Sequence, residues 1–159
     1  MSGSLLTGLV VAAALGAGLM AGLFFAFSAF VMDALGRLPP AQGIAAMQSI
    51  NVAVLNPVFL TVFVGTAALG ALLAVGALLG WGRGSAVALV AGALLYIVGT
   101  FGVTMAFNVP LNNQLAAAAP DSAEAAMLWR HYLVAWTAWN HVRTIGALAA
   151  TAAFIAALV

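Results

Sequence analysis

Long uninterrupted apolar stretches dominate the chain and predict membrane-spanning helices. A helix needs roughly 20 apolar residues to cross the hydrocarbon core of a bilayer. Four segments reach this length, namely residues 5–32, 57–79, 85–107 and 139–159. The first segment lacks a basic start and exceeds the roughly 7–15 apolar residues of a signal peptide, so we expect it to be retained. The pattern predicts an all-α fold, a four-helix transmembrane bundle that forms one integral membrane domain over residues 1–159.

The connections between these segments differ in length. A glycine-rich turn over residues 80–84 joins the second and third segments, whereas residues 33–56 and 108–132 form much longer connections. Connections of that length in so small a protein are expected to be ordered or functional. Residues 42–51 and 122–132 are predicted to form short amphipathic helices within them. Four spans would put both long connections on the same side of the membrane.

Composition supports the membrane class and excludes several others. The chain has 159 residues, of which 66% are hydrophobic and only 4% are charged, against about 25% charged residues in an ordinary soluble domain. So few charges cannot cover the surface of a water-soluble enzyme. So few charges also provide no basic patch for a nucleic acid. The expected surroundings of such an apolar chain are a lipid bilayer. The absence of cysteine excludes thiolate metal sites and iron–sulfur clusters.

Three asparagines surround Pro110 at the predicted end of the third helix. Polar groups beside a bilayer are costly, so their position is informative. Pro110 disfavours a helical conformation at the residue before it, and we expect the helix to stop near residue 107. The side chains of Asn108, Asn112 and Asn113 would either cap this end or line a binding site. Three amides exceed what one helix end requires.

A stripe of aromatic residues precedes the last apolar segment. If this part of the chain is helical, the stripe falls within about 80° of arc. Its members are Trp129, Tyr132, Trp136, Trp139 and Arg143, with Asn140 at its edge. In one interpretation the rings form an interfacial belt and Arg143 reaches the lipid headgroups. In the other, the stripe lines a pocket where a flat aromatic ligand stacks and Asn140 and Arg143 bind its oxygens.

The two histidines, His131 and His141, are the candidate bases. Both point away from the centre of the aromatic stripe, and they lie ten residues apart on one predicted helical segment. They cannot ligate one ion together without a break in the helix, so we expect no metal site, although a haem held by a single histidine stays an alternative. Histidine can act as a base near neutral pH, and amides and arginine can stabilise an oxyanion. Asp33 is expected to pair with Arg37 at the surface, and the alternative is that it faces Arg143 across the pocket.

Several motifs are similar to those of the anthrone oxygenase family, also called DUF1772. They are Phe-Asn-Val-Pro-Leu-Asn-Asn at 107–113, Trp129, Trp-Thr-Ala-Trp-Asn-His-Val-Arg-Thr at 136–144, the end of the first helix over 24–32, and the asparagines at 51 and 56. The resemblance covers essentially the whole chain. It implies a four-helix membrane protein, and named members of the family convert an anthrone into an anthraquinone with dioxygen and no evident cofactor. It also implies a bacterial cytoplasmic membrane as the location.

Under this resemblance each candidate residue has a hypothetical role. His141 or His131 would be the base, and Arg143 would help to stabilise the anion. The residues expected to hold the substrate are Asn108, Asn112, Asn113, Asn140, Trp129, Trp136 and Trp139. The substrate would be a polycyclic aromatic or quinol-type molecule, with dioxygen as co-substrate. The alternative function is a non-enzymatic membrane protein that binds a lipid or quinone or supports a membrane assembly, and assembly into a homo-oligomer stays open.

Overall fold

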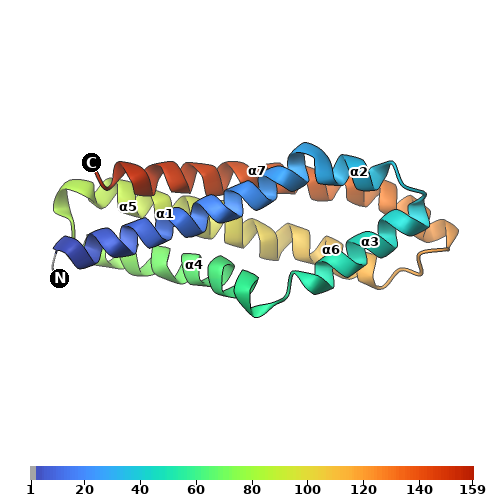
Figure 1. Ribbon diagram of the computed structural model, residues 1–159, viewed down its shortest axis with the longest axis horizontal. Coiled ribbons are helices and arrows are strands. Elements are labelled where there is room, and N and C mark those ends of the chain that lie inside the picture. The colour runs from blue at the N-terminus through green and yellow to red at the C-terminus, as the bar shows by residue number, and fades with distance from the viewer. Residues whose placement is uncertain (1–2) are drawn as a thin grey trace.

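The computed structural model describes residues 3–159, so the first two residues of the predicted domain lie outside it. Over the described residues the chain forms five helical rods (Figure 1). The first consists of α1 (Gly3–Ala26), the π-helical turn η1 (Phe27–Val31) and α2 (Met32–Gly36). The second and third are α3 (Pro40–Ala53) and α4 (Pro57–Leu78). The fourth consists of the 3-10 turn η2 (Arg83–Ser85), α5 (Ala86–Tyr96), the π-helical turns η3 (Ile97–Gly102) and η4 (Thr104–Asn108), and α6 (Val109–Ala116), and the fifth is α7 (Ala123–Ala156).

The all-α prediction is confirmed, but the count of four spanning helices is not exact. Three rods of the described chain are long and apolar enough to cross a membrane, namely residues 3–36, 57–78 and 83–116. They indicate an integral membrane protein. The predicted fourth span at 139–159 belongs to α7, which begins much earlier, at Ala123. Polar residues such as Asn140 and Arg143 lower the apolarity of α7, and both are buried inside the bundle.

Of the two amphipathic helices predicted in the long connections, only one is a separate element of the described chain. The amphipathic helix predicted at 42–51 is present as α3. The one predicted at 122–132 is wrong as a separate element, because it is the first part of α7. No proline interrupts residues 123–156, so nothing in the sequence breaks that helix.

Pro110 does not end the fourth rod, contrary to the prediction. The helix continues through Pro110 to Ala116, and the turn before the proline, η4, is π-helical. Proline lacks the N–H of a regular helical turn, and its ring clashes with a carbonyl one turn earlier. A wider π-helical turn accommodates such an interruption without ending the helix.

The rods differ in length, and comparison with the thickness of a bilayer indicates which part of the bundle the hydrocarbon core covers. The 22 residues of α4 extend about 33 Å, close to the thickness of a hydrocarbon core of about 30 Å. The 34 residues of α7 extend about 51 Å. Figure 1 shows both termini and the α4–α5 turn at one end, with α2, α3 and α6 at the other. A hydrocarbon core that covers α4 leaves α3, α6 and the first part of α7 outside it.

Each half of the bundle has its own packed core. The α4 half is the part of the bundle that lies beside α4, and the projecting half consists of α2, α3, α6 and the first part of α7. In the α4 half, small residues let helices approach closely. A Cβ built on Gly146 would lie 2.9 Å from the backbone of Gly99, so only glycine fits there. In the projecting half, Ile44, Trp129 and Tyr132 belong to a second buried cluster. The projecting half is therefore packed as a continuation of the bundle.

Candidate functional site

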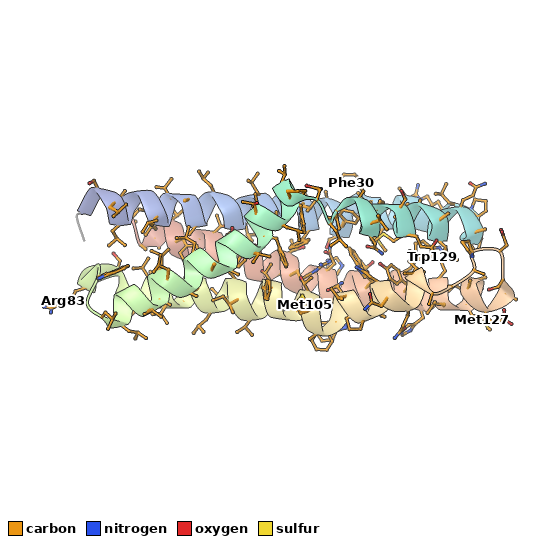
Figure 2. All side chains as sticks on the ribbon, turned by 90° about the horizontal axis from the view of Figure 1, so that it is seen from below. Phe30, Arg83, Met105, Met127 and Trp129 are labelled. Atoms are coloured by element: carbon orange, nitrogen blue, oxygen red, sulfur yellow. The ribbon has the colours of Figure 1, made fainter. Side chains whose placement is uncertain are left out.

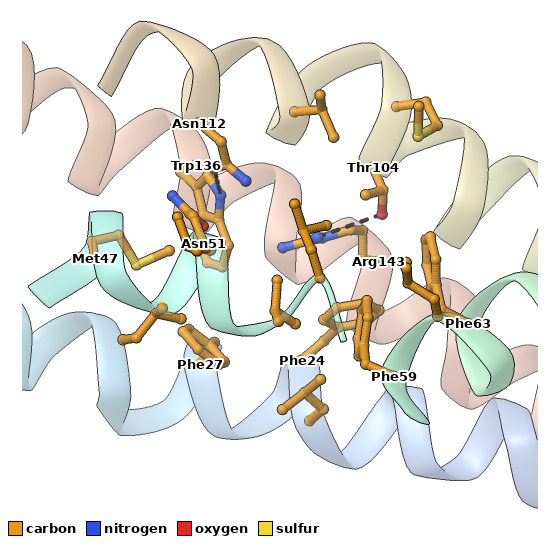
Figure 3. A pocket seen from close by; sticks show the side chains of 18 of the residues that line it. Phe24, Phe27, Met47, Asn51, Phe59, Phe63, Thr104, Asn112, Trp136 and Arg143 are labelled. Atoms are coloured by element: carbon orange, nitrogen blue, oxygen red, sulfur yellow. Dashed lines mark hydrogen bonds between the residues drawn. The ribbon is translucent and has the colours of Figure 1, made fainter. Parts of the chain in front are cut away.

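A cavity of about 740 Å³ lies where the two halves of the bundle meet. Its walls come from α1, from the corner between α3 and α4, from the segment η3–η4–α6 and from α7 (Figure 3). The volume is in the range of small-molecule sites, about 300–1,000 Å³. Most of the lining is apolar. The polar lining residues are Gln48, Asn51, Thr104, Asn112, Asn113 and Arg143.

Arg143 is a buried cation at this cavity, with 4% of its surface exposed. Its guanidinium lies 4.3 Å from the ring centroid of Phe24 and 4.7 Å from that of Trp136. Nη1 donates a hydrogen bond to Thr104 Oγ1 (3.4 Å), and Nε has no hydrogen-bond partner. Cation–π contacts of this kind stabilise the charge without neutralising it.

No carboxylate pairs with this guanidinium among residues 3–159. The ion pair present in that part of the chain joins Arg37 to Asp33 at the surface, as predicted, and both side chains are more than half exposed. A buried charge without a counter-ion is costly, and such residues at membrane depth commonly have a function. Arg143 therefore gives the cavity an uncompensated positive charge.

Asn140 holds the guanidinium in place from behind. Its Oδ1 accepts a hydrogen bond from Arg143 Nη2 (2.7 Å), while its Nδ2 donates to the carbonyl of Phe24 and to Ser28 Oγ, both at 2.7 Å. A π-helical turn leaves a backbone carbonyl free to accept from elsewhere, and Phe24 lies just before η1. Asn140 is fully buried and does not line the cavity. It is a positioning residue.

Asn112 presents a second donor to the cavity. Its Oδ1 accepts hydrogen bonds from the Tyr132 hydroxyl (2.7 Å) and from Trp136 Nε1 (2.8 Å). Because both partners are donors, they fix the orientation of the amide and leave Nδ2 as the free donor group. Arg143 and Asn112 therefore offer hydrogen-bond donors from two elements to one cavity (Figure 3).

The aromatic stripe is divided between the core and the outer surface. Trp129, Tyr132 and Trp136 are buried, and their rings stack at 5.6 and 6.0 Å. Trp136 lines the cavity, whereas Trp129 does not. Trp139 stacks on the half-exposed Phe107 at 3.6 Å and lies away from the cavity. The stripe thus contributes Trp136 and Arg143 to the cavity lining, and Trp129 and Trp139 lie outside it.

The other predicted site residues are dispersed. Asn108 is buried and donates from Nδ2 to the backbone carbonyl of Trp136 (3.2 Å), so it ties η4 to α7 outside the cavity lining. Asn113 lines the cavity and is exposed. His131 and His141 are both exposed, and neither lines the cavity. The geometry thus keeps both candidate bases away from Arg143.

No group that titrates near neutral pH lines the described cavity. Its lining contains no histidine, aspartate or glutamate. Within residues 3–159 no three histidine or carboxylate side chains come close enough together to hold a metal ion. The arrangement is suited to receiving a negative charge, since donors and a cation surround apolar walls.

Thr104 and Asn51 line the cavity and are absent from the site predicted from the sequence. A signal for Thr104 existed, because polar residues recur every four positions at 100, 104, 108 and 112. That spacing marks one polar side of an otherwise apolar helix. Asn51 ends up at the cavity because the chain turns between α3 and α4, and no local pattern predicts that fold-back.

The comparisons with known proteins identify the family. The family model for anthrone oxygenase matches residues 59–153, more than half of the chain, and this range contains Thr104, Asn112 and Arg143. No curated protein and no solved structure matches the chain. The motifs at 107–113, 129 and 136–144 that resembled this family in the sequence lie within the matched range. The chain belongs to the anthrone oxygenase family, also known as DUF1772.

Proposed function

We propose that this protein is a membrane-embedded oxygenase that binds an anthrone-type or quinol-type aromatic molecule as its anion and exposes it to dioxygen. The observation that carries the proposal is the buried, unpaired guanidinium of Arg143 facing an apolar cavity. Aromatic side chains, among them Phe27, Phe59 and Trp136, line the cavity and suit a flat ring system. No cofactor is part of the proposal, as the family resemblance implies.

The substrate oxygen would receive the negative charge. An anthrone is a carbon acid, and loss of a ring-carbon proton puts the charge mainly on the carbonyl oxygen. Donors that are already in place around such an oxygen stabilise it strongly in a site that excludes water. Arg143 Nε, Asn51 Nδ2 and Asn112 Nδ2 are groups at the cavity with donor capacity to spare. They would lower the pKa of the bound substrate.

The anion then reacts with dioxygen at the deprotonated carbon. A carbon–oxygen bond forms, and the peroxide anion takes up a proton to give a hydroperoxide. Loss of the second hydrogen from the same carbon breaks the O–O bond, leaves a carbonyl group and releases water. Anthrone and dioxygen thus give anthraquinone and water. A quinol held in the same way would give a quinone and hydrogen peroxide.

In this proposal the proton acceptor of the first step is water that reaches the cavity beside the exposed Asn113. Stabilisation of the anion by Arg143 makes a strong side-chain base unnecessary, and no lining residue could supply one near neutral pH. Catalysis by His131 or His141 is the alternative drawn from the sequence. It would require a chain of water molecules from the outer surface to the cavity.

Oxygen uptake by the protein in lipid nanodiscs tests the proposed activity. Anthrone is supplied as substrate, and a sample with empty nanodiscs is needed because anthrones oxidise slowly unaided. We expect uptake well above that blank, with anthraquinone formed, and a loss of about 10²–10³-fold in Arg143→Met. Arg83→Met, at the exposed α4–α5 turn, is the matched control and should behave as the wild type. Uptake equal to the blank would contradict the activity, and tight anthrone binding in that case would favour the non-enzymatic binding protein.

A further inference from the structure

The cavity opens sideways, through a gap between α4 and η4. Figure 2 shows α4 running obliquely across the bundle, close to α5 near Arg83 and away from Met105 of η4 at its own start. Along its length α4 packs against α5, α1 and η3. On the α4 side the rim consists of Leu60 and Val64, and Met105 lies on the opposite rim. These three side chains line the cavity and are also exposed, by 37%, 47% and 52%.

The opening lies at the level of the bilayer. Leu60 and Val64 belong to the first two turns of α4, within about 10 Å of its start. α4 is one of the three rods with the length and composition of a membrane span. Val52 and Leu55, which are also exposed and apolar, extend the rim toward the α3–α4 corner. This part of the rim is apolar and faces lipid chains, whereas the exposed Asn113 lines the cavity on the α6 side.

The interior differs sharply from this rim. Arg143 supplies a buried positive charge, and Asn112 and Thr104 add polar groups on the same side. The cavity of about 740 Å³ also exceeds what three fused aromatic rings occupy. A ligand that matches both regions has an acidic head and an apolar remainder directed at the gap.

We propose that the natural substrate is a membrane-resident amphiphile, an acidic aromatic head carrying a long apolar tail. The head binds beside Arg143, and the tail leaves through the gap between α4 and η4 and stays in the bilayer. Lipid chains are as apolar as the rim, so leaving the tail in the bilayer requires no transfer into water. This inference rests on the proposed function for its head group and adds the tail and the route of entry.

Variants that fill the gap test the binding of the tail separately from the binding of the head. The probes are 1-naphthol and 4-dodecyl-1-naphthol, which share an acidic aromatic head. Binding is measured in nanodiscs from the naphthol emission, excited where tryptophan does not absorb, with empty nanodiscs as the blank. Leu60→Trp and Val64→Trp fill the rim. Leu72→Trp and Val75→Trp are matched controls.

The control positions lie on the same helix, have similar exposure (46% and 55%) and do not line the cavity. We expect the wild type to bind both probes. Overfilling the gap should weaken binding of the dodecyl probe about tenfold or more and leave 1-naphthol within about twofold. The control variants should change neither affinity.

Arg143→Met distinguishes this inference from the proposed function. If it weakens both probes while the rim variants leave the dodecyl probe unchanged, the head site stands and the lateral tail is refuted. A failure of the wild type to bind the dodecyl probe, or an equal loss for both probes in the rim variants, also refutes the tail. If Arg143→Met changes neither affinity, the anion site of the proposed function itself fails.

Discussion

Asn140→Asp isolates the role of the unpaired charge on Arg143. The side chain of Asn140 accepts a hydrogen bond from Arg143 Nη2 at 2.7 Å, and a carboxylate of the same size accepts it as well. The substitution therefore keeps the guanidinium in place and adds a negative charge beside it. It gives up the bond to the Phe24 carbonyl, since an ionised aspartate has no donor.

The expected loss follows from the distance between the charges. Two unit charges about 4 Å apart interact by about 4 kcal/mol at the effective dielectric constant of about 20 that fits most protein sites. A carboxylate at position 140 would cancel most of the attraction that Arg143 exerts on a substrate anion. The affinity for the anion should fall by about 10³-fold at most, since 1.4 kcal/mol corresponds to a factor of ten.

Two further variants frame the assay, which is anthrone-dependent oxygen uptake in nanodiscs. Asn140→Ala leaves the charge of Arg143 unpaired but removes its support, so it should lose less activity than Asn140→Asp. Asn56→Asp makes the same chemical change at the exposed N-cap of α4, where aspartate caps equally well, and should be silent. Folding is checked by size-exclusion chromatography and thermal unfolding. Wild-type activity in a folded Asn140→Asp protein would refute the unpaired-charge mechanism, because the position of the Arg143 guanidinium would then be enough for activity without its net charge.

Two other predictions concern the histidines and the helix packing. His131→Ala and His141→Ala should each keep oxygen uptake within about twofold, because surface side chains away from a site contribute little; a large loss in either would reinstate a histidine base. Gly146→Ala should lower the free energy of unfolding by about 1–3 kcal/mol, because its Cβ would lie 2.9 Å from Gly99. Gly8→Ala, with open space around its Cβ, should not, and equal denaturation curves for the two variants would contradict the close packing.

The sequence predicted the helical class and one wall of the site. Apolar length alone located the first three spans, and the spacing of Trp129, Trp136 and Arg143 predicted a common helix face. That face is buried, and two of the three residues reach the cavity. Helical periodicity sufficed here because all three residues belong to a single regular helix.

The opposite wall could not be predicted in the same way. Phe59 and Asn51 meet Arg143 across the cavity only because the chain folds back between α3 and α4. Pro110 misled the prediction of a helix end, since a π-helical turn absorbs the proline and carries Asn112 onward along the helix. Nor does a sequence reveal that Asn140 supports the guanidinium from behind while Asn112 presents a free amide. That difference depends on three-dimensional hydrogen bonding.

An anaerobic titration of bound anthrone measures the anion site itself, separately from any oxidation. The absorbance of the anthrone anion is followed against pH for the protein in nanodiscs, with Arg143→Met and the matched Arg83→Met variant. A cation stabilises the deprotonated form, so binding should lower the pKa of anthrone. The wild-type and Arg83→Met proteins should show a pKa about two to three units below that with Arg143→Met. The same pKa in all three proteins would mean that Arg143 does not hold the substrate anion.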